Sequence, residues 1–286
     1  MLWTQIKGND RPHPDMSEKR QSARETMQKR LRTRSNFAFH FYYLIFKRLL
    51  HKQFHAVRVA NLPDETVFKT PKLVIYTNHP SWWDAVTFHY IAYRFLGARH
   101  VYWPFDAEMI KRYGFFSKIG AFGVEQKQAL GSRHFIEACR LIFAEPRNAL
   151  LLTAQGRFVD CRVRPLKLDK GIAHIGDLAP DATYLPLAIE YTHWLEKRPE
   201  LLMNFGKPQD GKTFEGMSRT VRLQRLESVL TQTMDELAEK SIARDVSGFQ
   251  TLAIGHEGIY PVYDLWRRGK AVLTRRPYYS RHGDPP

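Results

Sequence analysis

Short apolar runs alternate along this chain with segments of helical periodicity, and this alternation restricts the fold more than any other feature. The run at 73–77 is short and β-branched, and comparable runs cover 149–153, 182–191 and 201–205. Apolar residues at helical spacing cover 132–144 and 218–239. Strands that alternate with helices form a mainly parallel sheet with helices on its faces. We therefore expect one α/β domain, built on a mainly parallel central sheet flanked by helices.

Charge and composition divide the chain into three parts. Residues 1–35 carry nine Lys or Arg against four Asp or Glu, which predicts a basic N-terminal arm. The segment lacks the apolar stretch of a signal peptide. Residues 36–245 are expected to form the domain, and 246–286 a basic, aromatic tail that packs on the domain or on a membrane. Two cysteines, Cys139 and Cys161, give neither a disulfide framework nor metal-ligand spacing. We expect no metal and no bound cofactor.

The segment 37–46 is apolar almost all round and rich in aromatic side chains. As a helix it would be about 15 Å long, roughly half the hydrocarbon core of a bilayer, so it should not cross a membrane alone. Basic residues follow at once, at Lys47, Arg48 and Lys52. Aromatic bulk beside basic charge is typical of an interfacial membrane helix, and a core helix packed under the sheet is the compatible alternative.

The net charge of +15 predicts an anionic partner. The basic residues gather near the two termini, which suits a membrane surface, and the C-terminal group interleaves with Trp266, Tyr278 and Tyr279. Nucleic acid is disfavoured because the aromatic-basic motifs of nucleic-acid surfaces are absent. The sequence therefore predicts a cytoplasmic protein bound peripherally to the inner face of the cell membrane.

Directly after the 73–77 run the chain reads Asn78-His79-Pro80-Ser81-Trp82-Trp83-Asp84, an N-H-x4-D pattern. The following residues, 85–96, suit a helix, so the pattern falls on a strand-to-helix turn. Within one helix, positions five apart lie about 140° around the axis and do not meet, whereas on a turn Asp84 can reach back to His79. A carboxylate that orients a neutral imidazole makes it a general base. A helix-capping pair or a satisfied core histidine is the alternative.

Three further segments follow this motif in order. They are 120–126, then 153–157 with 165–173 after it, then 184–189 with Phe205-Gly206-Lys207-Pro208 beyond. With N-H-x4-D, the ordered set resembles the glycerolipid acyltransferases of the bacterial lysophosphatidate acyltransferase type, over roughly residues 50–210. The resemblance implies acyl transfer from acyl-CoA or acyl carrier protein to a hydroxyl of a lysophospholipid or of another lipid or glycolipid. It implies catalysis by His79 and Asp84, and substrate binding by Asn78, Ser81, Gln126, Gln155, Gly156, Arg157 and Lys170.

Two positions depart from the family pattern. Gln126 stands where the family has arginine, and Gln155 where it has glutamate. The loss of a guanidinium removes a bidentate phosphate clamp, and the amide of Gln155 keeps the shape of glutamate without its charge. The base and its orienting acid are kept, so the resemblance implies retained acyl transfer with an altered acceptor. No G-x-S-x-G motif is present, which favours direct attack of the alcohol on the thioester.

A basic cluster follows the 149–153 run. As a functional feature it would dock the phosphate of the acceptor, of coenzyme A or of an acidic carrier protein, and the alternative is a solvated loop. Its spacing beside a strand end favours function for Arg157 and Lys170 more than for the others. The cluster comprises Arg157, Arg162, Arg164, Lys167 and Lys170.

A different class of protein is indicated by residues 206–213, which match the phosphate-loop pattern G-x4-G-K-[ST] after a strand-like run. A nucleotide-binding protein is therefore an alternative. Asp210 disfavours it, because its carboxylate would face the nucleotide phosphates. A non-catalytic membrane-binding relative of the acyltransferases is the other alternative.

Overall fold

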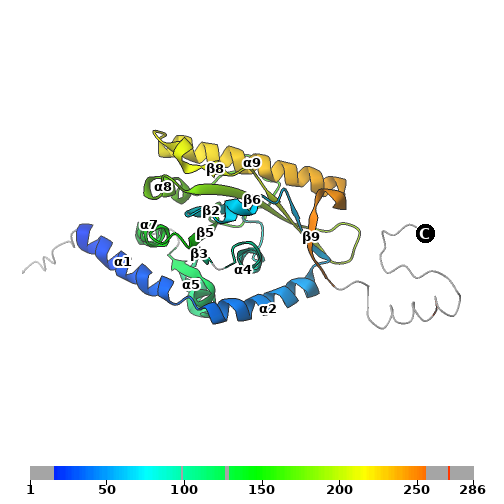
Figure 1. Cartoon of the computed structure of the whole chain (residues 1–286), viewed down its shortest axis with the longest axis horizontal. Helices are drawn as coiled ribbons and strands as arrows, with labels where there is room; N and C mark the ends of the chain where they lie inside the picture. The colour runs from blue at the N-terminus through cyan, green and yellow to red at the C-terminus, as the bar shows by residue number, and fades with distance from the viewer. Residues whose placement is uncertain (1–15, 98, 126–128, 256–269, 271–286) are drawn as a thin grey trace, which may run out of the picture.

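The computed structural model describes residues 16–97, 99–125, 129–255 and 270, and its centre is a mixed sheet between two helical layers (Figure 1). The strands lie in the order β4-β3-β5-β2-β6-β7-β1-β9, with β8 beside β6. Their bounds are β1 Ala56–Ala60, β2 Leu73–Thr77, β3 His100–Asp106, β4 Ala121–Val124, β5 Asn148–Thr153, β6 Thr183–Thr192, β7 Glu200–Phe205, β8 Gln209–Asp210 and β9 Gln250–Ile254.

The helices follow in chain order: α1 Met16–Arg32, α2 Asn36–Gln53, α3 Glu65–Phe68, α4 Asp84–Phe95, α5 Ala107–Arg112, α6 Phe115–Ile119, α7 Ala129–Phe143, α8 Gly171–Leu178 and α9 Arg219–Ala243. Strand β2 pairs in parallel with β5 and β6, and β3 pairs in parallel with β4 and β5. The pairs β6–β7 and β1–β9 are antiparallel. The predicted fold class, an α/β domain with a mainly parallel sheet, is confirmed.

Strand β2 is buried on both faces, which explains its unbroken apolar sequence. Successive side chains of a strand point to opposite faces. Leu73 and Ile75 pack in the layer that holds α2 and α4, and Val74 and Tyr76 pack in the layer that holds α7, α8 and α9. Parallel neighbours on both sides bring the carboxyl ends of β2 and β5 to one edge of the sheet.

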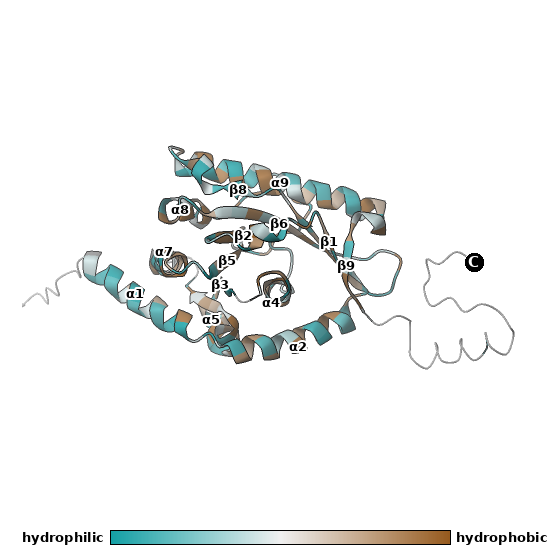
Figure 2. Ribbon diagram, in the orientation of Figure 1, coloured by the Kyte–Doolittle hydropathy of each residue, from teal (hydrophilic) through white to brown (hydrophobic). Residues whose placement is uncertain are grey.

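Helix α1 occupies much of the segment predicted to be a basic arm. Ala23 and Met27 are buried, and Arg20 Nε donates to Glu137 of α7 over 3.2 Å. Figure 2 shows α1 as largely hydrophilic, so few of its side chains contribute to the core. From residue 16 onward the segment is a packed helix of the domain, and residues 1–15 lie outside the described ranges.

Helix α2 is the predicted aromatic helix, and it begins at a capped N-terminus where Ser35 accepts from the Ala38 amide. Its side chains Phe39, Phe46 and Leu50 are buried in the core between α2, α4 and the sheet. No helix in the described ranges is both long and apolar enough to cross a membrane.

Strand β9 lies inside the segment predicted to be a C-terminal tail. It pairs with β1, and Arg58 Nη1 on β1 donates to Thr251 Oγ1 over 2.6 Å. The domain therefore extends past its predicted end at residue 245. Strand β9 pairs with the edge strand β1 and covers its backbone groups. The basic and aromatic part of the tail, 256–269 and 271–286, lies outside the described residues.

Candidate active site

The N-H-x4-D motif forms the turn between β2 and α4, at the carboxyl end of the strand. Asp84 is the first residue of α4 and His79 lies two residues beyond the end of β2. His79 Nδ1 and Asp84 Oδ2 are 2.6 Å apart. The Asp84 side chain is 2% exposed, whereas that of His79 is 20% exposed. The acid is thus enclosed in protein and the imidazole retains access to solvent.

Asn78 holds the turn against β6. Its Nδ2 donates to the carbonyl of Ile189 over 2.8 Å, and the Ile189 amide donates to its Oδ1 over 2.8 Å. This requires one side chain with both a donor and an acceptor in one plane, which an amide supplies. Asn78 is 1% exposed, so its side chain positions the turn from below the surface.

Gln155, in the loop that follows β5, holds the same turn from the other side. The amide of His79 donates to Gln155 Oε1 over 2.8 Å, and the amide of Val159 donates to the carbonyl of His79 over 2.9 Å. The loop after β5 therefore forms hydrogen bonds with both the backbone amide and the backbone carbonyl of His79. The ring of Phe158 in this loop lies 4.3 Å from the imidazole, centroid to centroid, and is 61% exposed. Phe158 is a neighbour of the candidate base that motif reasoning missed.

Tyr191 on β6 is a second residue that the motif does not contain. Its hydroxyl donates to Asp84 Oδ1 over 2.8 Å and lies 2.9 Å from Thr87 Oγ1. Alternation along β6 places Tyr191 on the same face as Ile189, toward α4. That alternation is readable from the sequence, but the contact with Asp84 joins residues 107 positions apart. Only the packing of α4 on the sheet brings them together.

Burial and hydrogen bonding act in opposite directions on Asp84. Burial raises the pKa of its carboxyl above the ordinary value, and the contacts from His79, Tyr191 and the Ser81 amide oppose that rise. Burial and the nearby carboxylate raise the pKa of the Tyr191 phenol well above its ordinary value, so the phenol keeps its proton and acts as donor. With Nδ1 of His79 held by Asp84, Nε2 is the atom left to accept a proton from an alcohol.

The other predicted binding residues divide into three groups. Ser81 takes part in the turn, because its Oγ accepts from the Trp83 amide and its own amide donates to Asp84 Oδ2. Gly156 has a φ of +64°, a left-handed conformation that lets the chain reverse after β5. Arg157 and Lys170 are exposed, and Lys170 immediately precedes α8. Gln126 lies outside the described residues.

The predicted basic cluster is partly neutralised. Arg162 pairs with Asp160 over 2.7 Å, Arg164 pairs with Asp235, and Lys167 lies 4.0 Å from Glu227. Arg157 and Lys170 make no ion pair with any carboxylate of the described residues. Of the five residues of the cluster, these two side chains are therefore the ones whose charge is not neutralised by a nearby carboxylate.

The structure contradicts the phosphate-loop alternative. Residues 206–213 do not form a loop that leads into a helix, but a turn, the short strand β8 and a 3-10 helix at Gly211–Phe214. The amides of Gly206 and Gly211 donate to carbonyls of Pro186 and Ala182, and the Lys212 amide donates to Asp210. A phosphate loop needs these N–H groups free to face the phosphates. Here strand pairing and an Asp210 cap already use them.

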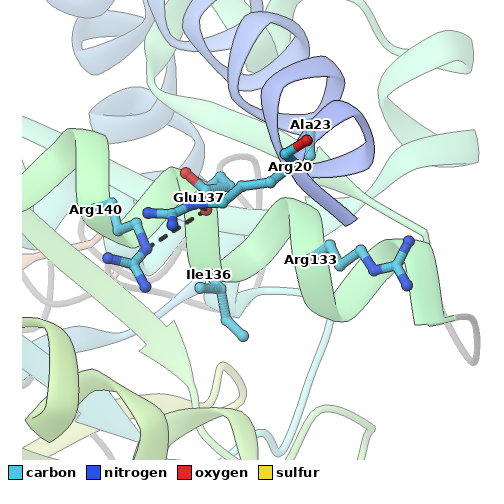
Figure 3. Close-up of a pocket in the computed structure, with 7 residues that line it drawn as sticks. Arg20, Ala23, Arg133, Ile136, Glu137 and Arg140 are labelled. Atoms are coloured by element: carbon cyan, nitrogen blue, oxygen red, sulfur yellow. Dashed lines mark hydrogen bonds and ion pairs between the residues drawn. The ribbon is translucent and has the colours of Figure 1, made fainter. Parts of the chain in front are cut away.

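A cavity of about 390 Å³ lies between α1 and α7, and its lining contains no residue of the N-H-x4-D motif. In Figure 3, Arg20 and Arg140 turn toward Glu137, whereas Arg133 points away from them. Glu137 is buried and pairs with both Arg20 and Arg140. The three guanidinium groups do not converge on one point, so this cavity is part of the contact between the two helices.

No group of three or more His, Cys, Asp or Glu side chains that could hold a metal ion occurs within the described ranges. No protein-family model and no curated protein matches the sequence. Among solved structures, the chain is similar to the crystal structure of the 1-acyl-sn-glycerophosphate (LPA) acyltransferase PlsC from Thermotoga maritima, with 15% sequence identity and a TM-score of 0.46. The match covers 79% of this chain and 84% of that one. A likeness this distant leaves the activity to be argued from the residues themselves.

Proposed function

We propose that this protein moves an acyl chain from a thioester donor, acyl-CoA or acyl carrier protein, to a hydroxyl of a lysophospholipid or of another lipid or glycolipid. One observation carries the proposal. A buried carboxylate holds Nδ1 of a partly exposed imidazole at 2.6 Å, on a turn at the carboxyl end of a central strand. This is the arrangement that a general base for an alcohol requires.

The reaction needs one base and no covalent intermediate on the protein. His79 Nε2 takes the proton of the acceptor hydroxyl while the hydroxyl oxygen forms a bond to the thioester carbonyl carbon. The carbon–sulfur bond then breaks, and the departing thiolate takes the proton from the imidazolium, which leaves an ester and a thiol. Asp84 supports the transient positive charge on the imidazole. Ser81 is not the nucleophile in this scheme, because its hydroxyl is engaged in the turn.

The anionic parts of the substrates are assigned to Arg157 and Lys170. Both are exposed, lie in the segment between β5 and α8, and lack an ion-pair partner among the described carboxylates. A phosphate of the acceptor, of coenzyme A or of a carrier protein carries the charge that they would bind. The exposed ring of Phe158, 4.3 Å from His79, offers an apolar surface for the acyl chain beside the base.

The membrane is the proposed partner surface, and α2 is the proposed contact. While one side of α2 packs in the core, its other side exposes large apolar side chains: Phe37 80%, Phe41 48%, Leu44 51% and Ile45 42%. Exposed aromatic and aliphatic groups on a helix followed by Lys47 and Arg48 suit the interface of an anionic bilayer. Peripheral binding at the cytoplasmic face would deliver lipid acceptors to His79.

The decisive experiment incubates the purified full chain with labelled acyl-CoA or acylated carrier protein and a mixture of lysolipids and glycolipids, followed by lipid profiling. An acylated product that disappears in Asp84→Asn supports the proposal, and His193→Ala, at an exposed histidine, is the control. Vesicle binding without product from any donor and acceptor pair would refute acyl transfer and identify a non-catalytic membrane protein.

A further inference from the structure

We infer that Tyr191 is a positioning residue of the His79–Asp84 pair, acting through a hydrogen bond that sets the orientation of the Asp84 carboxylate. The catalytic consequence rests on the proposed function, but the contact itself does not. The N-H-x4-D pattern does not include Tyr191, which lies on β6 and contacts the first residue of α4.

Both carboxylate oxygens of Asp84 are engaged, each in a different direction. Oδ2 contacts His79 Nδ1 at 2.6 Å and accepts from the Ser81 amide at 3.3 Å, and Oδ1 accepts from the Tyr191 hydroxyl at 2.8 Å. A carboxylate bonded through one oxygen can rotate about its Cβ–Cγ bond, whereas bonds through both oxygens fix its plane. Without Tyr191, Oδ1 would be a buried acceptor of an enclosed carboxylate, which is costly.

The direction of the hydrogen bonds follows from the chemistry of the three groups. An ionised carboxylate only accepts, so the phenol must donate to Asp84. The phenolic oxygen can then accept from Thr87 Oγ1, 2.9 Å away on the next turn of α4. Thr87 is fully buried, which excludes water as a competing partner. The result is a directed chain from Thr87 through Tyr191 to Asp84 and His79.

Tyr191 is itself held in place by the motif. Strand β6 continues beyond its last pairing with β2 at Leu187, and the Asn78 amide fixes it at Ile189, two residues before Tyr191. The Tyr191 ring packs against Phe54 at 5.8 Å between centroids. One residue of the motif, Asn78, therefore places the phenol that another residue of the motif, Asp84, binds.

The hydrogen bond has a measurable electrostatic consequence. The titratable groups that face Asp84 are the His79 imidazole from the turn and the Tyr191 phenol from β6; within the described residues its ion-pair partner is His79. Loss of the phenol donor concentrates negative charge on Asp84, which stabilises a protonated His79. In a variant without the phenol, His79 should therefore take up its proton at a higher pH than in the wild type.

The test is a titration of His79 by NMR in the full chain labelled at histidine nitrogen, with His79 identified by its absence in His79→Gln. In Tyr191→Phe the apparent pKa should rise by about one unit, the size expected for loss of one charge-assisted hydrogen bond. The acid limb of the pH–kcat/KM profile should move up by the same amount. Tyr184→Phe is the matched control on the same strand, because its buried hydroxyl has no partner among the described residues.

An unchanged His79 titration in folded Tyr191→Phe would overturn the inference. The titration needs no substrate, so it still decides if the wild type proves to have no acyl transfer activity. If Tyr191→Phe does not fold, Thr87→Val removes the donor to the phenol and should raise the same pKa by a smaller amount, and no rise there would equally overturn it.

Discussion

The backbone amide of His79 donates to Oε1 of Gln155 over 2.8 Å, which joins the turn after β2 to the loop after β5. Gln155 stands where the resembling family has glutamate, and the bond needs only an acceptor oxygen, which either side chain supplies. The acceptor oxygen that holds the His79 amide is therefore kept. Its effect is on charge, because the site lacks one carboxylate.

The first prediction tests this contact. Gln155→Glu should keep the folded structure and His79-dependent turnover, because the acceptor is retained. Gln155→Leu should destabilise the protein by about 1–3 kcal/mol and lower turnover, because it leaves the His79 amide without its partner. Thermal unfolding and acyl transfer assays on both variants measure this. Equal behaviour of the two variants would contradict the assigned role.

The second prediction concerns the base. His79→Ala should lower turnover by about 10²–10⁴-fold, the range that general-base catalysis supplies. Asp84→Asn should also be severe, because the amide no longer selects the imidazole tautomer. Initial rates with the best donor and acceptor pair measure the effect, with His193→Ala as control. Near-normal turnover in His79→Ala would refute the proposed general-base mechanism.

The third prediction concerns the acceptor. Gln126 lacks the guanidinium that would bind phosphate bidentately, so lysophosphatidate and glycerol 3-phosphate should be poor acceptors relative to other lipids. Competition assays with mixed acceptors give the ratio of kcat/KM values directly. A preference for lysophosphatidate would show that Gln126 and Gln155 are neutral replacements.

The fourth prediction is a pH dependence of stability at Glu125. Burial acts to raise the pKa of this carboxyl, but contacts from Arg30 and His134 outweigh it and lower the pKa to about 2. A lowered folded pKa stabilises the protein above the unfolded value of 4.5, and this contribution disappears as the pH falls toward about 2.

Glu125→Gln should therefore be less stable than wild type by about 1–2 kcal/mol near pH 6, and the gap should close on acidification to pH 2. Urea unfolding across this pH range measures the gap. Glu239→Gln, at an exposed carboxylate of α9, should show no such trend. A gap that does not narrow would contradict the assignment.

The fifth prediction concerns membrane binding. Deleting residues 1–53 would remove buried Met27, Phe39, Phe46 and Leu50, so surface substitutions are the cleaner test. The triple variant Phe37→Ser, Phe41→Ser and Leu44→Ser should lose the salt-resistant part of its binding to anionic vesicles and keep an electrostatic part that salt screens. Sedimentation with vesicles at low and high salt measures both parts. Equal binding of wild type to neutral and anionic vesicles would refute the electrostatic part.

Local pattern determined several strands and helices at the centre of this protein. Apolar runs such as 73–77 are strands because their length and branching suit a strand buried on both faces, and N-H-x4-D falls on a turn because a helix would separate its two ends. The α/β class followed from the alternation of these elements. The extents of the N-terminal arm and the C-terminal tail could not be predicted in this way. The pairing of β9 with β1 and the packing of α1 on α7 depend on residues that are distant in the chain.

Only the tertiary structure decided what surrounds the candidate base. The contacts of His79 with Gln155 and Phe158, and of Asp84 with Tyr191, join residues from three different strand ends. Parallel pairing of β2 with β5 and β6 brings those ends to one edge of the sheet, and no periodicity in the sequence encodes which residues then meet. Other tertiary contacts exclude the phosphate loop, because the Gly206 and Gly211 amides donate to the carbonyls of Pro186 and Ala182. The N-H-x4-D motif identifies His79 and Asp84, whereas the order of the strands determines which residues of other segments contact them.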